Sequence, residues 1–244
     1  MLMTIYGRAF KVLLQKPFKL WGISLLAILL TSALTALCGV AIPVLGIAVA
    51  LLLSTSMTMI FLRGYRGEDV NVTDLFACFK DWNTIKRVVL GLGWMALWIF
   101  LWSLIPIVGP IIALIRAYEY RLTPYILVYE PDVSITDAIK VSSQKTKGYK
   151  LQMWLADFVY VLFFIAAVIV LGLLSAIPYL GILFALALIF IYIAFVALAP
   201  LFAGLVQSAF YEEITAANSR VCPNCGQRVA LDASFCGKCG TPMN

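Results

Sequence analysis

The sequence predicts an all-α membrane protein with about six transmembrane helices, built as three repeated helical hairpins with Pro-Gly tips and followed by a small metal-binding lobe. Three observations predict this fold class. The chain has very long runs without charge, three similar Pro-Gly pentapeptides lie inside apolar stretches, and four cysteines form two C-x-x-C pairs near the end. Only 12% of the 244 residues are charged and 63% are hydrophobic, whereas a soluble domain has about twice that charged fraction.

The apolar residues come in runs that are long enough for two membrane spans each. No charged residue occurs over the 43 positions from Leu20 to Leu62, or over the 54 positions from Phe158 to Tyr211. A helix needs about 20 apolar residues to cross a bilayer. Because the backbone polar groups must bond internally within lipid, these runs are predicted to be helices.

Three similar pentapeptides mark the expected reversals of the chain. They read Ile-Pro-Val-Leu-Gly at 42–46, Ile-Pro-Ile-Val-Gly at 105–109 and Ile-Pro-Tyr-Leu-Gly at 177–181. Proline cannot continue a helix and glycine permits a tight reversal, so each pentapeptide suits the tip of a helical hairpin. The first two tips are 63 residues apart, and the similar segments 69–74 and 132–137 share that offset. The sequence therefore predicts an internal repeat.

Each repeat unit is expected to contain a cytoplasmic amphipathic helix, an outgoing span, a tip and a returning span. The units are predicted at residues 1–66, 67–130 and 131–212 of a membrane domain that covers 1–215. The six spans are predicted at residues 21–40, 44–62, 88–104, 110–129, 154–176 and 180–206. The amphipathic helices have two interpretations: they bind anionic lipid headgroups at the interface, or they only cover the cytoplasmic end of the bundle.

The basic residues indicate the orientation of the chain. Sixteen of the eighteen Lys and Arg residues fall in the segments 1–19, 63–87, 140–150 and 220–238, and the hairpin tips carry none. This asymmetry predicts that both termini lie on the cytoplasmic side of the plasma membrane. The net charge of +6 is thereby interpreted as a sign of topology, and a nucleic-acid partner is not expected.

The fourth predicted span is unusual because it carries charges in its middle. Arg116 lies seven residues after Gly109, which is about 10 Å along a helix and well short of a ~30 Å hydrocarbon core. Charges at this depth usually face a bundle interior or a water-filled cavity. The second span has hydroxyl groups at a comparable depth. The predicted intramembrane polar site consists of Arg116, Glu119, Arg121, Ser56 and Thr58.

Three interpretations of this polar segment are open. The first is a site for a solute, an ion or a lipid headgroup. The second is an ion pair between Arg116 and Glu119, three residues apart on one helix face, that locks the packing of the helices. The third is a helix that lies shallow and does not cross the bilayer.

The cysteine cluster predicts a metal site. Cys222 and Cys225 form one C-x-x-C pair and Cys236 and Cys239 form the other, with a glycine after each pair. Four thiolates in this spacing are typical of tetrahedral structural zinc, with no position left for a catalytic water. The lobe, predicted at 222–244 after a linker at 216–221, is too small for a hydrophobic core of its own, so Zn²⁺ must supply most of its folding free energy. We expect only three apolar side chains to pack between the knuckles: Val229, Leu231 and Phe235.

Two resemblances add to this interpretation. The segment from Cys222 to Gly240 resembles the short zinc-ribbon domains, with two zinc knuckles, at the ends of many bacterial and archaeal proteins; such ribbons usually mediate contacts or are stable appendages. The stretch from Tyr118 to Asp132, followed by Ala138-Ile139 and Ser143, is similar to a bacterial family of six-span membrane proteins, domain of unknown function 975. That second resemblance implies a six-span fold and no activity.

The chain has no histidine, and it shows no nucleophile elbow, phosphate-binding loop or pair of catalytic carboxylates. We therefore expect a protein that is not an enzyme: a membrane scaffold or adaptor whose cytosolic zinc ribbon docks a partner or subunit. The alternative is a small transporter or channel with Arg116 and Glu119 in its path. The partners expected are the lipid bilayer, a cytosolic protein and a second copy of the chain.

Overall fold

The computed structural model describes residues 2–15, 17–41, 43–177, 181–226, 228–230, 234–236 and 238–242. Within these residues the chain forms nine α-helices, one 3-10 helix and two short strands. In chain order these elements are α1 (Leu2–Gln15), α2 (Pro17–Ala41), α3 (Pro43–Tyr65), η1 (Val72–Phe79), α4 (Trp82–Ser103), α5 (Gly109–Glu119), α6 (Thr123–Tyr129), α7 (Ala138–Lys145), α8 (Lys150–Leu174), α9 (Gly181–Ala217), β1 (Ser219–Val221) and β2 (Arg228–Ala230).

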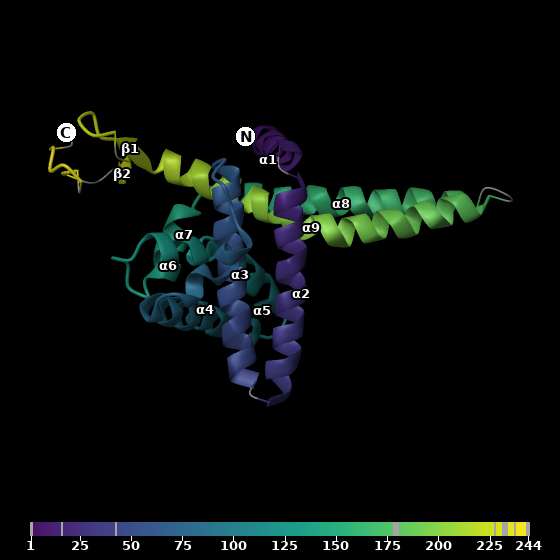
Figure 1. The fold of residues 1–244 in the computed structure, drawn as a ribbon, viewed down its shortest axis with the longest axis horizontal. Helices are drawn as coiled ribbons and strands as arrows, with labels where there is room; N and C mark the ends of the chain where they lie inside the picture. Colours follow the sequence, from purple (N-terminus) through teal and green to yellow (C-terminus); the bar gives the residue numbers. More distant parts are fainter. Residues whose placement is uncertain are drawn as a thin grey trace.

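The long helices form two extended hairpins that share a core. Figure 1 shows the hairpins α2–α3 and α8–α9 pointing in different directions from the region where their bases meet. Side chains from α1, α3, α6 and α9 fill this region, and the largest buried ones include Ile5, Ile60, Leu62, Tyr125, Ile126 and Leu201. Farther out, the hairpin surfaces expose large apolar side chains such as Phe163, Leu173, Ile182 and Phe190. These surfaces suit the hydrocarbon of a bilayer.

Several helices are long and apolar enough to cross a membrane, so the prediction of a helical membrane protein is confirmed. Among the described residues, α2, α3, α4 and α8 qualify, and α9 is a fifth if its two bent parts form one span. The parts of α9 meet at an angle of 41° between Val196 and Leu198. Pro200 explains the bend, because its ring clashes with the carbonyl group four residues earlier.

The fourth predicted span is not a continuous helix, so six spans are not confirmed among the described residues. Residues 110–129 are divided between α5, of 11 residues, and α6, of seven. At 1.5 Å per residue, α5 is about 16 Å long, about half of a ~30 Å hydrocarbon core. Pro124 accounts for the break, because proline has no backbone N–H and disfavours a helical carbonyl four residues before it; here it lies in the first turn of α6.

The surface helices also differ from the prediction. The amphipathic helix expected at the start of the second unit is the short η1, and α4 begins already at Trp82, where the carboxylate of Asp81 accepts a hydrogen bond from the Thr84 backbone N–H at 3.0 Å. The amphipathic helix expected at the start of the third unit is α7, of eight residues. A strong N-cap at Asp81 therefore starts the third span about six residues before its predicted position.

The second and third tips share one geometry. The backbone N–H of Gly109 donates to the Ile105 carbonyl oxygen at 2.9 Å, and that of Gly181 donates to the Ile177 carbonyl oxygen at 2.8 Å. A Cβ on either glycine would lie 2.8 Å or less from a backbone oxygen of the preceding helix. Both tips therefore need glycine.

The first tip differs, because Gly46 lies within α3 and residue 42 lies outside the described residues. The internal repeat stays a prediction.

Candidate metal centre and polar network

The four cysteines of the C-terminal lobe lie together. Strand β1 pairs antiparallel with β2, with Arg220 opposite Val229, and Cys222 follows β1 directly. All four sulfur atoms lie within 4.8 Å of one another. The Sγ atoms of Cys222 and Cys239 are 3.6 Å apart, and so are those of Cys225 and Cys236. A tetrahedral zinc ion with Zn–S bonds of about 2.3 Å requires sulfur separations of roughly 3.8 Å, so the four thiols fit this ion.

Glycines shape the two knuckles in the same way. Gly226 and Gly240 have positive φ angles of 69° and 71°, which glycine adopts without steric cost. The N–H of Gly226 donates to the Cys222 carbonyl oxygen at 3.0 Å, and the N–H of Gly240 donates to that of Cys236 at 2.8 Å. Each C-x-x-C-Gly segment therefore closes into one tight turn.

Hydrogen bonds favour the thiolate form that binds metal. The pKa of the Cys239 thiol is lowered to about 6, chiefly by its hydrogen bond with the Thr241 hydroxyl and then by the Thr241 backbone N–H. The pKa of the Cys222 thiol is also lowered, first of all by the backbone N–H of Cys225. Donors aimed at sulfur stabilise the negative charge that a ligand thiolate carries.

The apolar packing of this lobe is smaller than the sequence predicts. Val229 packs against the cysteine cluster, but the Phe235 side chain is 65% exposed, so the expectation that Phe235 packs between the knuckles is wrong. Leu231 lies outside the described residues. Because the described residues of the lobe bury little apolar surface, the metal must hold the lobe together.

Comparison with known proteins agrees with this geometry. Residues 221–243 match the zinc-ribbon domain family. No curated protein and no solved structure matches the chain. The protein is thus a membrane protein with a C-terminal zinc-binding domain. Its Cys222, Cys225, Cys236 and Cys239 are the ligands of a structural Zn²⁺, as the spacing of the cysteines predicts.

The second candidate site lies at the break between α5 and α6. The carboxylate of Glu119 is only 8% exposed and binds two cations, Arg116 at 2.5 Å and Lys150 at 2.5 Å. The Ser143 hydroxyl donates to the same carboxylate at 3.2 Å. The predicted pair of Arg116 and Glu119 is therefore part of a network that also includes α7 and the start of α8.

Helix α7 also binds the free backbone groups of the break. The Ser142 and Thr146 hydroxyls donate to the Glu119 carbonyl oxygen at 2.7 and 3.1 Å, and the Leu122 N–H donates to the Ser142 hydroxyl oxygen at 3.2 Å. A buried helix end needs such partners. The break is therefore a specific, hydrogen-bonded structure.

Arg121 is separate from this network. Its guanidinium binds both carboxylate oxygens of Asp157 in α8, at 2.5 and 3.1 Å, and the Tyr118 hydroxyl donates to the same carboxylate at 3.0 Å. No local pattern in the sequence indicates that Asp157 is the partner, although an isolated carboxylate in an apolar helix requires one.

The hydroxyl groups of α3 lie elsewhere. Ser56 is buried in α3, and Thr58 donates to the Ser54 carbonyl oxygen of its own helix at 2.9 Å. Among the described residues neither makes a hydrogen bond to Arg116 or Glu119. Of the five predicted polar-site residues, the structure therefore joins Arg116 and Glu119, and it leaves Ser56 and Thr58 apart from them.

Proposed function

We propose that the protein is a non-enzymatic scaffold in the plasma membrane, with both termini cytoplasmic, whose zinc ribbon docks a cytosolic protein or another subunit. The observation that carries this proposal is the direct connection between α9 and the ribbon. Residues 216–221, expected to form a linker, are instead the end of α9, one residue of turn and strand β1. The Asn218 side chain donates to the Ile214 carbonyl oxygen at 2.9 Å and so binds the last turn of the helix. The ribbon therefore follows the end of α9 after a single residue.

Ion pairs fix the ribbon end of α9 to the core. Arg66, after α3, binds Glu212 at 2.6 Å, and Arg8 of α1 binds Glu213 at 2.5 Å. Each pair is partly exposed and contributes little alone. Together with the buried side chains of Ala209, Phe210 and Ile214, they hold α9 against two helices. A docking domain that follows a helix held in this way binds its partner at a defined position relative to the membrane helices.

The ribbon offers an apolar surface to a partner. Val221 is 61% exposed and Phe235 is 65% exposed, although the lobe has few apolar residues. Aromatic side chains are enriched among the residues that dominate interface energies. The metal stabilises the lobe and leaves these side chains free for docking.

The charged segment gives less support to a transporter or channel. The Glu119 carboxylate is almost fully covered and has three hydrogen-bond partners, so its binding capacity is used within the protein. A transported solute or ion would need to displace these partners. The network instead supports the interpretation that Arg116 and Glu119 lock helix packing.

We further propose that residues 1–215 belong with the domain of unknown function 975 family and arose from three related units. The shared geometry of the tips at Gly109 and Gly181 supports related units, and the short α5 then marks the place where the second unit diverged.

The docking proposal is tested by affinity purification from native membranes with a Phe235→Ser variant and a matched Lys238→Ser variant. Both positions are exposed on the ribbon, and the zinc content of each purified protein shows that the lobe is intact. We expect Phe235→Ser to lose a partner that the wild type and Lys238→Ser retain. Identical partners and oligomeric state in the wild type, Phe235→Ser and a chain truncated before Cys222 would show that the ribbon is only an appendage.

A further inference from the structure

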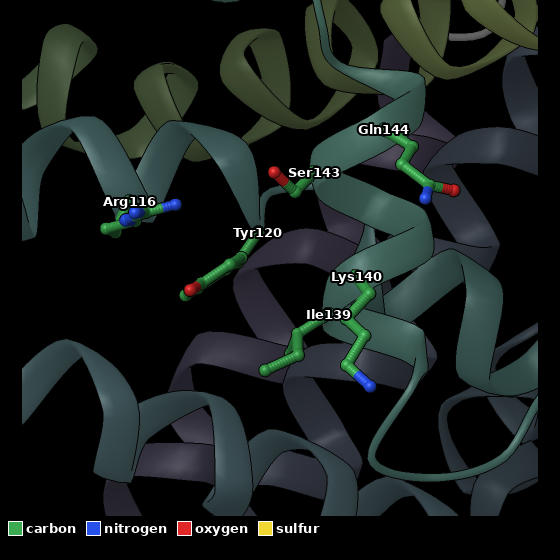
Figure 2. A pocket seen from close by; sticks show the side chains of 6 residues that line it. All are labelled: Arg116, Tyr120, Ile139, Lys140, Ser143 and Gln144. Atoms are coloured by element: carbon green, nitrogen blue, oxygen red, sulfur yellow. The ribbon is translucent and has the colours of Figure 1, made fainter.

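A groove lies on the surface between α4, α5 and α7. It consists of two adjoining hollows, of about 320 and 270 Å³, that share four lining residues: Arg116, Tyr120, Ile139 and Lys140. Figure 2 shows the first hollow, with Arg116 and Tyr120 on one side and the α7 residues on the other. The volume is in the range of small-molecule and headgroup sites.

One wall of the groove is aromatic. Trp94, Trp98 and Trp102 line the second hollow and recur every fourth residue of α4, so they share one helix face. The rings of Trp94 and Trp98 meet edge to face at 5.9 Å, and the Arg116 guanidinium lies 5.1 Å from the centre of the Trp102 ring. The indole N–H of Trp102 is buried and has no hydrogen-bond acceptor among the described residues.

Two cations, Arg116 and Lys140, line the groove. Arg116 shares the single carboxylate of Glu119 with Lys150, which lies outside the groove, so this carboxylate does not fully neutralise the charge of Arg116. Lys140 pairs with Asp137 at 2.7 Å, but the two side chains are 74% and 48% exposed. Such an exposed pair is weak and exchanges readily with other anions. An incoming anion can therefore bind both cations without breaking a buried contact.

The groove also opens beside a surface that suits lipid. Helix α4 is long and apolar enough to cross a membrane, and it exposes Leu97, Phe100 and Leu101. Tryptophan is the residue type that prefers the boundary between headgroups and hydrocarbon. A ligand for the whole groove must combine an anionic group with a hydrocarbon chain. Free phosphate would bind the two cations, but it would leave the three tryptophan side chains of the groove uncovered.

We propose that this groove is a binding site for one anionic phospholipid. The headgroup phosphate lies between Arg116 and Lys140, and an acyl chain lies along Trp94, Trp98 and Trp102. This site is independent of the docking role of the zinc ribbon.

The test is native mass spectrometry of the full-length protein in detergent, titrated with dioleoylphosphatidylglycerol, with dioleoylphosphatidylcholine and with inorganic phosphate. Both lipids carry a phosphate, but the quaternary ammonium of phosphatidylcholine cancels its net charge. We expect phosphatidylglycerol to bind at least about five-fold more tightly, since the attraction of one cation to a net anionic headgroup contributes about this factor. Inorganic phosphate at millimolar concentration should not displace the lipid. Equal affinity for the two lipids would overturn the proposal, and displacement by phosphate would identify a site for the free anion.

Three variants of residues that line the groove, and one control variant, test whether the lipid binds there. Lys140→Gln changes an exposed side chain and should weaken phosphatidylglycerol binding by about five-fold, whereas Lys147→Gln, an exposed lysine just after α7, should change it by less than two-fold. Trp98→Ala should weaken binding of both lipids. Arg116→Gln is a second test of the headgroup position, with its thermal unfolding measured to show that it folds. If Lys140→Gln and Trp98→Ala both bind lipid as the wild type does, the groove is not the site.

Discussion

The carboxylate of Glu119 is the central element of the break between α5 and α6, and the change of Glu119 to Gln tests its contribution. The carboxylate is 8% exposed and accepts charged hydrogen bonds from Arg116 and Lys150, which are 36% and 35% exposed. A hydrogen bond to a charged group contributes about 1.5–3 kcal/mol. The glutamine oxygen can keep one of the two bonds, and both cations are partly hydrated. We therefore expect a loss of about 2–3 kcal/mol.

This loss is measured as a shift of the thermal unfolding midpoint of the purified protein in detergent. At this chain length 1 kcal/mol corresponds to about 2–4 °C, so Glu119→Gln should unfold roughly 4–12 °C below the wild type. The matched control is Glu68→Gln, which makes the same chemical change in a pair with Arg63 at 3.3 Å whose side chains are 46% and 39% exposed. Such a pair contributes at most about 1 kcal/mol. A Glu119→Gln midpoint that does not fall below that of the control refutes the argument.

Three further outcomes are expected. Cys236→Ser should reduce the zinc content measured by elemental mass spectrometry from one ion per chain to almost none, because a four-ligand structural site binds with a free energy on the order of 10 kcal/mol, while the helical circular dichroism of the membrane domain stays unchanged. Gly204→Ala should lower the free energy of unfolding by about 1–3 kcal/mol, because its Cβ would lie 2.2 Å from the Phe61 ring. The control Gly172→Ala, whose Cβ would have nothing within 4 Å, should not lower it. Equal unfolding midpoints for the two variants would contradict the packing of α3 on α9. Tyr125→Phe removes a buried hydroxyl that is 3.2 Å from a serine of α9, and should cost about 1 kcal/mol in the same unfolding assay.

The zinc ribbon could be predicted from the sequence because its chemistry is local. The pairs of cysteines and the glycines after them specify the two turns and the ligands. The exposure of Phe235 could not be predicted in this way. A reader of the sequence expects the few apolar residues of a small lobe to be buried, but a lobe held by metal does not depend on burying them.

The apolar helices could be predicted for a similar reason, because their length and composition are properties of single segments. The break after α5 depends on tertiary contacts as well. Pro124 indicates that the helix is disturbed, but only the packing of α7 shows that Ser142 and Thr146 bind the freed carbonyl group. The pairing of Arg121 with Asp157, 36 residues away, likewise follows from how α5 packs on α8. The different directions of the two long hairpins have no counterpart in any local pattern.

The length of α9 has a mechanical consequence. Its 37 residues extend over about 55 Å, and Figure 1 shows the ribbon at the opposite end of this helix from the α8–α9 arm. The part of α9 in the hairpin and the part next to the ribbon lie on opposite sides of the core around Leu201 and Leu205. A tilt of the α8–α9 hairpin about this core, as when the bilayer around it changes thickness, moves the ribbon in the opposite direction when the 41° bend before Pro200 is kept. A change in the membrane around the α8–α9 hairpin is thus coupled through α9 to the position of the zinc ribbon.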